Sequence, residues 1–296
     1  MRIIAATDMD VIKATQLRSA YGNKKDNGRI AVIAGSREYH SAPSLAANAV
    51  YNLLAGLRVG TGYAYLYVPD DVIDAVRALT PSMIVRRFGG DYIGSGDLST
   101  LKRQLSSIES IVIGMGIGRN PPALRMSSKI IDYAVGSGKK IVVDADGIYS
   151  IKHVKRLNSN VVLTPHDREF EELSGHIPNK RSLRKRAVAA VSLSRKLDCC
   201  VLLKGHDTVI TDGNSVKVVR SKSSALATMG TGDVLAGIIG GYMATGTDAF
   251  RSAVAGAYVH SRIGDMLYRR MGNHIISSDV VSSMPAFLKR FDKNVE

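Results

Sequence analysis

The chain of 296 residues has no tryptophan and only two cysteines, Cys199 and Cys200, which are adjacent. Both lie in the apolar run 199–203, which is typical of a buried strand, so we expect no metal or redox role for them. No apolar run reaches the roughly 18 residues of a membrane span. The apolar patch at the N-terminus is also too short for a signal peptide. We therefore expect a cytoplasmic protein that does not act at a membrane.

The sequence also lacks the pattern Gly-x-x-x-x-Gly-Lys-Ser/Thr, which excludes a P-loop as its anion site. The segment 225–237, Ala-Leu-Ala-Thr-Met-Gly-Thr-Gly-Asp-Val-Leu-Ala-Gly, offers another kind of site. Gly230 and Gly232 let a phosphate approach the free N–H groups at the start of a buried helix. Asp233 follows directly and can accept a proton from a hydroxyl group, which suits phosphoryl transfer to an alcohol. Many such turns merely join a strand to a helix, so the pattern alone leaves both interpretations open.

The net charge of +14 is large, and nucleic acid binding is one possible reason for it. The charge is spread along the chain, however, and the densest cluster, 180–186, lies in an expected helix whose other face is apolar. We interpret this cluster as solvated surface. Attraction of polyanionic small molecules explains the charge at least as well, and a role in solubility better still, so we expect no nucleic acid partner.

Short apolar strands alternate with helices along most of the sequence. Strands are expected at 29–34, 63–68, 110–114, 140–144, 160–164 and 200–204, with a hairpin of 208–211 and 216–220. Helices are expected at 42–56, 122–135, 181–193, 234–244, 249–270 and 278–290. Continuous apolar strands between helices predict an α/β fold with a mostly parallel sheet and helices on both faces. We expect a leader at 1–28 and one domain at 29–296.

Ligands of such sheets bind beyond the carboxyl ends of the strands. Lys204-Gly-His-Asp-Thr208 follows one strand, and its charge and hydroxyl group can position a nucleotide, although Lys-Gly turns are common. Asp144 and Asp146 follow another, where electrostatic support of a site and turn formation are equally plausible roles. The segment Gly114-Met-Gly-Ile-Gly118 can bring backbone close to a flat substrate, but it does not continue into a Rossmann fingerprint. His260 is expected to be a packed core or interface histidine.

The segment Thr164-Pro-His-Asp-Arg-Glu-Phe-Glu-Glu-Leu173 also begins at the end of a strand. His166 and Glu169 are three residues apart and can face the cleft from one helical turn. A carboxylate at Glu169 can hold hydrated Mg²⁺, which usually keeps several of its waters. For Asp167 we favour a capping role at the N-terminus of the helix.

Taken together, these segments resemble the ribokinase-like superfamily and, within it, the ADP/ATP-dependent NAD(P)H-hydrate dehydratases. The resemblance runs from about Gly28 to Leu288, and its markers are the segments 34–46, 112–118, 143–147, 163–169, 203–208, 227–233 and 274–279. It implies a ribokinase-like three-layer sandwich. It also implies a lyase that uses ADP or ATP, with Mg²⁺, to phosphorylate the C6 hydroxyl of hydrated NADH or NADPH. Phosphate is then eliminated, because the lone pair of the ring nitrogen can expel it.

The resemblance further assigns roles to individual residues. Asp233 is implied to be the catalytic base, and Glu169 to organise the water around Mg²⁺. The residues implied to bind the nucleotide are Lys204, Gly205, His206, Asp207, Thr208, Gly230, Thr231 and Gly232. Those implied to contact the hydrated dinucleotide are Ala42, Gly116, Gly118, His166 and Asp233.

The sequence departs from the family pattern at Met229, Ala34 and Ser41, where relatives usually have glycine, and at Met115, where they have proline. The resemblance implies a homo-oligomer such as a tetramer. Many relatives carry an N-terminal epimerase domain, which the leader is too short to hold. We therefore expect the epimerase to be a separate chain.

The alternative enzyme is a kinase of the same superfamily acting on a hydroxymethylpyrimidine, a thiazole alcohol or a sugar. It should lack the Thr-Pro-His and Ala-Pro-Ser-Leu-Ala segments, which are present here. A basic nucleic-acid-binding protein with an inactive kinase fold is a third hypothesis, which the retained Asp233 and Lys204 disfavour.

Overall fold

The computed structural model describes residues 1–19, 21–36, 42–79, 82–90, 93 and 98–292, apart from the side chains of 42–49, 71 and 79. Its strands form one ten-stranded sheet in the order β1-β10-β9-β8-β7-β6-β5-β2-β3-β4. The strands are β1 (Ile4–Ala5), β2 (Arg29–Ile33), β3 (Tyr63–Val68), β4 (Ile84–Arg87), β5 (Ser110–Ile113), β6 (Lys140–Val143), β7 (Val161–Leu163), β8 (Cys200–Leu203), β9 (Asp207–Thr211) and β10 (Val216–Arg220). Neighbours are parallel except β9, which runs antiparallel to both β8 and β10, so the predicted hairpin is confirmed.

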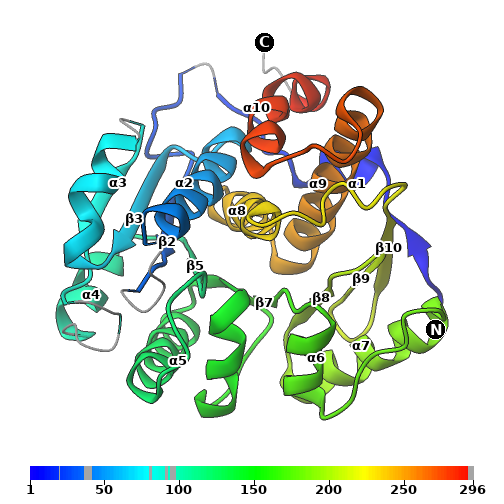
Figure 1. Cartoon of the computed structure of the whole chain (residues 1–296), viewed down its shortest axis with the longest axis horizontal. Coiled ribbons are helices and arrows are strands. Elements are labelled where there is room, and N and C mark those ends of the chain that lie inside the picture. The colour runs from blue at the N-terminus through cyan, green and yellow to red at the C-terminus, as the bar shows by residue number, and fades with distance from the viewer. Residues whose placement is uncertain (20, 37–41, 80–81, 91–92, 94–97, 293–296) are drawn as a thin grey trace.

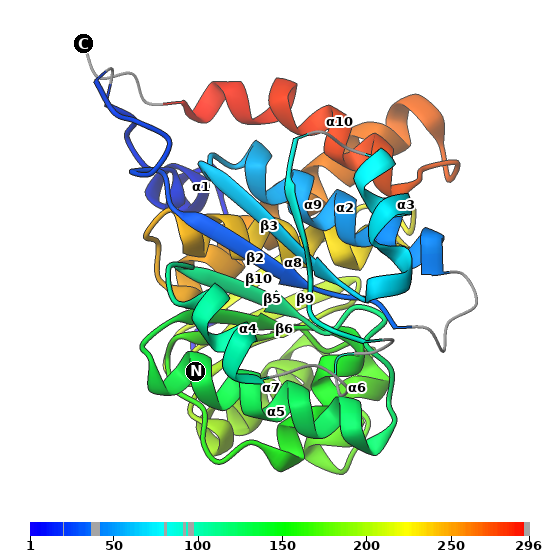
Figure 2. The same cartoon turned by 90° about the vertical axis from the view of Figure 1, so that its left-hand side faces the viewer.

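Helices cover both faces of this sheet (Figures 1 and 2). They are α1 (Asp8–Ala14), α2 (Ala42–Arg58), α3 (Ile73–Leu79), α4 (Leu98–Leu105), α5 (Pro121–Gly136), α6 (Asp167–Ser174), α7 (Leu183–Leu197), α8 (Thr231–Ala244), α9 (Ala249–Met271) and α10 (Ser277–Leu288), with a 3₁₀ segment η3 (Ala145–His153). The three-layer α/β sandwich expected from the alternating pattern is therefore confirmed. Among the described helices, none has both the length and the apolarity needed to cross a bilayer.

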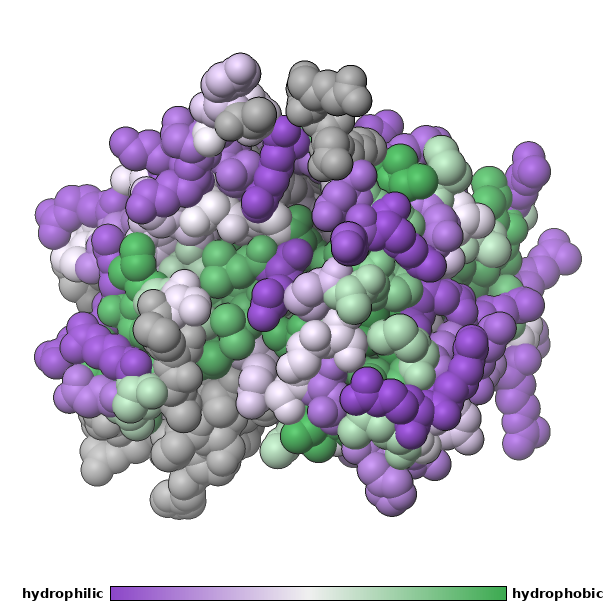
Figure 3. Space-filling view, turned by 90° about the horizontal axis from the view of Figure 1, so that it is seen from above, coloured by the Kyte–Doolittle hydropathy of each residue, from purple (hydrophilic) through white to green (hydrophobic). Residues whose placement is uncertain are grey.

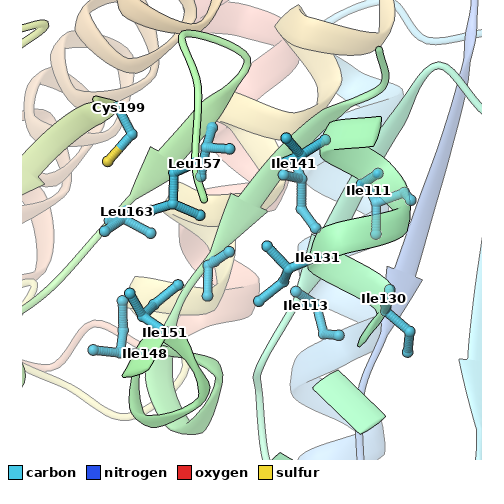
Figure 4. Packing of buried hydrophobic residues seen from close by; sticks show 14 of the residues in the cluster. Ile111, Ile113, Ile130, Ile131, Ile141, Ile148, Ile151, Leu157, Leu163 and Cys199 are labelled. Carbon is cyan, nitrogen blue, oxygen red and sulfur yellow. The ribbon is translucent and has the colours of Figure 1, made fainter. Parts of the chain in front are cut away.

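Alternating side chains of the central strands pack into two hydrophobic cores, one on each face of the sheet, because successive strand residues point to opposite faces. In β2, Ile30 and Val32 pack on the side of α2, α8 and α9, whereas Ala31 and Ile33 pack on the side of α5 and α7. Figure 4 shows part of the second core, between β5, β6, β7 and the helices below them. Both cysteines are buried, one in each core, as their apolar run predicts.

Several elements escape the sequence patterns because they are short. The edge strand β4 carries two arginines. Charged residues protect an exposed sheet edge from pairing with other chains, but they also make the strand difficult to recognise from its sequence. Within the first 28 residues, β1 pairs in parallel with β10, and α1 packs against α9. Lys217 Nζ of β10 lies 2.8 Å from Asp10 Oδ1 and ties this helix to the sheet. On the face seen from above, hydrophilic side chains are spread widely, and apolar ones lie between them in smaller groups (Figure 3).

The close approach of α2 and α8 requires glycine in α8. A β-carbon at Gly237 would lie 1.9 Å from the carbonyl oxygen of Asn52. Replacing Gly237 with alanine is expected to lower the free energy of unfolding by ~1–3 kcal/mol, although alanine is intrinsically the better helix former. Urea denaturation measures this change. Gly136→Ala is the control, because its new β-carbon meets nothing within 4 Å. Equal midpoints for the two variants would contradict the close approach.

Candidate functional site

Four neighbouring parallel strands deliver the predicted polar residues to one edge of the sheet. Ile113 of β5 lies opposite Val143 of β6, which lies opposite Leu163 of β7, and Leu163 pairs with Val201 of β8. The segments that follow these strands begin at 114, 144, 164 and 204. Residues almost a hundred positions apart therefore meet at the carboxyl ends of the strands, where ligands of such sheets bind.

Lys204 is the cation around which this edge is arranged. Its Nζ lies 2.7 Å from Asp144 Oδ1 and 3.7 Å from Glu169 Oε2. Asp144 and Glu169 are both buried. Burial alone would lower the pKa of Lys204, but the neighbouring carboxylates of Asp144, Glu169 and Asp233 outweigh it and raise the pKa. The lysine therefore keeps its positive charge at the edge of the sheet.

Asp233 lies in the first turn of α8, beside this lysine. The helix begins at Thr231, three residues earlier than the apolar segment predicts, and Gly230 caps it in the left-handed conformation at φ 86°. A β-carbon at Gly232 would lie 3.8 Å from Lys204 Nζ, so the turn abuts the lysine. Burial and the nearby charge of Asp144 raise the pKa of Asp233 to about 7, although Lys204 opposes them. A carboxylate with that pKa is suited to accept a proton near neutral pH.

His166 and Glu169, which the spacing predicts to face the cleft from one helical turn, contact each other at the start of α6. The Glu169 N–H donates to His166 Nδ1 over 3.3 Å, and the His166 N–H donates to Glu169 Oε2 over 2.8 Å. The second carboxylate oxygen of Glu169 lies 3.3 Å from His166 Nε2. Burial raises the pKa of Glu169 to about 7, with Lys204 opposing, and burial and Lys204 lower the pKa of His166. This reciprocal cap fixes both side chains beside Lys204.

The two aspartates after β6, Asp144 and Asp146, have different contacts in the structure. Asp144 gives electrostatic support through Lys204, as described above. Asp146 holds the glycine segment, since its Oδ2 accepts from the Gly118 N–H over 3.3 Å and its Oδ1 from Arg119 Nε over 2.7 Å. Gly116 and Gly118 both have positive φ, 61° and 84°, which side chains rarely adopt. The backbone of this segment is therefore held in a fixed conformation next to Asp144, with Gly118 buried and Gly116 partly accessible.

A cavity of about 370 Å³ lies between the 204–208 turn and the start of α8. Six of the predicted nucleotide-binding residues line it: Lys204, Gly205, His206, Thr208, Thr231 and Gly232. Of the remaining two, Gly230 caps α8 outside the lining, and Asp207 is turned to Arg220, whose Nε lies 3.3 Å from its Oδ1. Ala42 is the first residue of α2, but its side chain lies outside the described part of the structure. A larger cavity, about 600 Å³, lies at the other end of α8 and contains none of the predicted residues.

The expectation that His260 is a packed histidine is confirmed, and the residue also lines the cavity of about 370 Å³ beside the 204–208 turn. It is buried in the middle of α9, as expected, but α9 packs its face against the turn that starts α8. The sequence gives no local sign of this contact, because the two segments are joined only through the tertiary fold.

The position of Arg186 corrects the expectation that the charge cluster 180–186 is solvated surface. It is buried, its Nη1 lies 2.7 Å from Asp167 Oδ1, and its Nη2 donates to the carbonyl oxygen of Lys204. A β-carbon at Gly205 would lie 2.7 Å from Nη2, so the guanidinium group supports the 204–208 turn from beneath. The charge cluster in the sequence conceals this role, which depends on a carboxylate in another helix.

Replacing Arg186 with methionine is expected to lower the free energy of unfolding by ~1–3 kcal/mol, because Asp167 and the Lys204 carbonyl oxygen lose a charged donor, although Asp167 is partly exposed and keeps Lys180 as a partner. The looser turn should also raise the KM for the nucleotide. Thermal unfolding and nucleotide titration measure the two effects. Arg184→Met, at an exposed position of the same helix, should change stability by less than ~0.5 kcal/mol. If both variants behaved alike, the supporting role of Arg186 would be wrong.

Within the described ranges, no group of three histidine, cysteine, aspartate or glutamate side chains is arranged to hold a metal ion. The carboxylates of Asp144 and Glu169 instead flank Lys204. A divalent ion at this edge would therefore depend on one or two carboxylates, on water and on the ligand's own phosphates, which is how Mg²⁺ is usually held.

Comparison with known proteins identifies relatives over nearly the whole chain. A family model described as NAD(P)H-hydrate dehydratase matches residues 30–285. The chain is 32% identical over 286 residues to an ADP-dependent (S)-NAD(P)H-hydrate dehydratase from Cenarchaeum symbiosum, covering 96% of each protein. It is 31% identical over 274 residues to a bifunctional NAD(P)H-hydrate repair enzyme Nnr from Pyrobaculum aerophilum. That match covers 93% of this chain and 53% of the relative, so the chain spans about half the length of the bifunctional relatives.

Solved structures share the fold at lower identity. A ribokinase-like superfamily protein from Enterococcus faecalis superposes with a TM-score of 0.83 at 22% identity, covering 98% of this chain and 96% of that one. An ADP/ATP-dependent NAD(P)H-hydrate dehydratase from Bacillus subtilis, co-crystallised with ATP and Mg²⁺, gives a TM-score of 0.79 at 22% identity, covering 99% and 100%. The fold is thus ribokinase-like, and the matched family model and relatives show that the chain belongs to the NAD(P)H-hydrate dehydratase family.

Proposed function

We propose that this chain catalyses the ADP- or ATP-dependent dehydration of hydrated NADH and NADPH, by phosphorylation of the C6 hydroxyl and elimination of phosphate. The observation that carries the proposal is the carboxylate of Asp233, with its raised pKa, beside the charged Lys204 at the start of α8. Family membership and the relative named as an ADP-dependent dehydratase support the same reaction over the kinase alternative.

In the proposed first step, Asp233 accepts the proton of the C6 hydroxyl while the hydroxyl oxygen bonds to the terminal phosphorus of the donor. The bond between that phosphorus and its bridging oxygen breaks, and the shortened nucleotide leaves. The N–H groups at the start of α8, around Thr231 and Gly232, stabilise the negative charge on the transferred group. In the second step, the ring nitrogen lone pair expels phosphate, and loss of a proton from the adjacent ring carbon restores the ring double bond. A poor leaving group has thus been converted into a good one.

The cavity between the 204–208 turn and α8 is the proposed nucleotide site, with Lys204 and Gly232 at the phosphates. The backbone at Gly116 and Gly118, together with His166 and Ala42, is proposed to contact the hydrated dinucleotide on the other side of Asp233. Both segments begin at the same edge of the sheet, which supports a reaction between ligands bound on either side of this carboxylate.

Mg²⁺ fits this site through few protein ligands. Glu169 is the carboxylate we assign to it, through water, because it lies beside Lys204, where the donor's phosphates are proposed to lie. When bound, the ion would neutralise charge on the donor's phosphates.

Incubation of the purified protein with hydrated NADH, Mg²⁺ and either ADP or ATP tests the proposal. Recovery of absorbance at the reduced-nicotinamide band should depend on the nucleotide. Parallel incubations with a hydroxymethylpyrimidine or a thiazole alcohol test the kinase alternative. Consumption of nucleotide with those alcohols and none with hydrated NADH would overturn the proposed function.

Replacing Asp233 with asparagine is expected to raise Tm at about pH 8 and to leave it nearly unchanged at about pH 4. The raised pKa of Asp233 means that the folded protein binds more protons than the unfolded chain between its ordinary value of 3.8 and about 7. Its contribution to stability is therefore complete at low pH and is lost as pH rises through that window. Calorimetry at both pH values measures the difference. Asp74→Asn, at an exposed aspartate, should show no such pH dependence.

We also propose that the enzyme is a cytoplasmic homo-oligomer that acts together with a hydrate epimerase activity. Support for a second activity comes from relatives whose name describes them as bifunctional repair enzymes. Sedimentation of the purified chain tests the oligomeric part of this proposal.

A further inference from the structure

The cavity of about 600 Å³ at the other end of α8 lies away from the proposed active site. Tyr242, in the last turn of α8, lines it, whereas Asp233 lies in the first turn of the same helix. The rest of the lining comes from the chain after α1, from the end of α2, and from the end of α10 with the 3₁₀ turn that follows it. Pockets for small molecules usually measure about 300–1,000 Å³, so this cavity is large enough for a metabolite.

Positive charge predominates in the lining of this cavity. Arg18, Arg58 and Lys289 come from three separate segments and are all exposed, whereas Asp292 is the one acidic residue among the described residues of the lining. In the part of the chain that the structure describes, none of the three cations forms an ion pair. Arg290, next to Lys289, is by contrast 3.0 Å from a carboxylate oxygen of α1. An anion in the cavity would therefore meet three cations that no carboxylate already pairs with.

The guanidinium group of Arg18 is held in a defined position. Its Nη2 donates to the carbonyl oxygen of Gly60, which also lines the cavity. A β-carbon at Gly60 would lie 3.5 Å from Nη2 and 3.9 Å from Nε, so the group lies against the chain that follows α2. Guanidinium has five N–H donors in a planar fork, and those that remain can donate to two oxygen atoms of one phosphate.

Cations near helix ends can also serve only to balance the partial negative charge there. The end of α8 has its own cation for this purpose, because Lys140 Nζ donates to the carbonyl oxygens of Met243 and Thr247. Arg58 and Lys289 lie at the ends of α2 and α10 but donate to no carbonyl oxygen within the described residues. A helix end carries roughly half a unit charge, which is less than the full charge of either side chain. Positive charge therefore remains for a ligand.

Apolar side chains supply another part of the lining, namely Leu57, Val59, Pro285 and Leu288. A ligand that is only an anion would leave these side chains in water, whereas an anion with an apolar part would cover them. Among biological anions, the phosphate group carries two negative charges and matches the fork of arginine. We propose that this cavity is a second ligand site, which binds a small phosphate ester with its phosphate at the three cations and its apolar part against the aliphatic side chains.

Calorimetric titration of the intact protein with phenyl phosphate at pH 8 tests this proposal, because the probe carries a doubly charged phosphate and a flat apolar ring. Arg18→Gln, Arg58→Gln and Lys289→Gln should each weaken binding roughly 3- to 10-fold. Asp292→Asn should instead strengthen binding roughly 2-fold, because it removes the negative charge of the lining. Lys13→Gln is the matched control, since it removes an exposed cation of α1 outside the lining and should leave binding unchanged. All five positions are exposed, so the variants should fold.

The proposed nucleotide cavity also attracts phosphate, and Lys204→Met separates the two sites. Binding of phenyl phosphate should persist in that variant, and phenol and inorganic phosphate should each bind more weakly than phenyl phosphate. Wild-type protein that binds no phenyl phosphate at millimolar concentration would overturn the proposal, as would binding that only Lys204→Met removes. Equal effects of Lys13→Gln and Lys289→Gln, or weaker binding in Asp292→Asn, would also overturn it. None of these results depends on the repair reaction, so the proposed function can fail or hold independently.

Discussion

Replacement of Asp233 by asparagine is expected to lower the rate of nucleotide-dependent NADH recovery by ~10²–10⁴-fold, the usual contribution of a positioned general base. Asparagine keeps the size of the side chain but cannot take the proton of the C6 hydroxyl. The loss should appear in kcat, with little change in the affinity for ADP, because the Asp233 side chain does not line the nucleotide cavity.

The pH dependence of the wild-type rate gives a second readout of the same residue. Because the pKa of Asp233 is about 7, the rate should rise as pH increases through that value in the free enzyme. The residual rate of the Asp233→Asn variant should lack this rise. Equal rates for variant and wild type would remove Asp233 from the role of base.

Lys204→Met is expected to reduce kcat by ~10²–10³-fold, the effect of losing one preorganised group that stabilises transition-state charge. It should also move the acid limb of the pH–rate profile to higher pH, because Lys204 holds down the pKa values of both Asp233 and Glu169. Stopped-flow absorbance across a pH series measures both effects. Lys180→Met removes an exposed cation paired with Asp167 and should leave the profile unchanged.

Replacing Asp144 with asparagine is expected to shift the pH–rate profile in the opposite direction. Asp144 raises the pKa of Asp233, and its loss also frees Lys204 to interact with the remaining carboxylates, so the acid limb should move to lower pH. Lys204→Met and Asp144→Asn profiles that moved in the same direction would contradict the electrostatic arrangement described for this site.

The sequence patterns were sufficient to predict the sheet and the residues at its carboxyl edge. Strand periodicity located most of the strands, and parallel neighbours necessarily bring the segments that follow them together. Helical spacing placed His166 and Glu169 on one turn, but it did not predict the reciprocal hydrogen bonds between them. Lys204 could be singled out for its place after a strand, but its partner Asp144, sixty residues away, depends on the strand order.

Features that depend on tertiary contacts could not be predicted in this way. The arginines of 180–186 look alike in the sequence, yet Arg186 is buried because Asp167 and the Lys204 carbonyl group lie within its reach. His260 is buried as expected, but its place beside the cavity depends on the packing of α9 against α8. The apolar segment predicts a start for α8 at Val234, three residues late, because Thr231 and Gly232 are not apolar. The N–H groups of that first turn are nevertheless the feature on which the proposed chemistry depends.

The fate of the hydroxyl oxygen tests the central claim most directly. Hydrated NADH prepared with heavy oxygen in its C6 hydroxyl, incubated with the enzyme and ATP, should transfer that oxygen to the inorganic phosphate released, one for each NADH recovered. Mass spectrometry of the phosphate measures it. Heavy oxygen found in water while the phosphate stays unlabelled would show that the alcohol leaves without being phosphorylated, and would contradict the role assigned to Asp233.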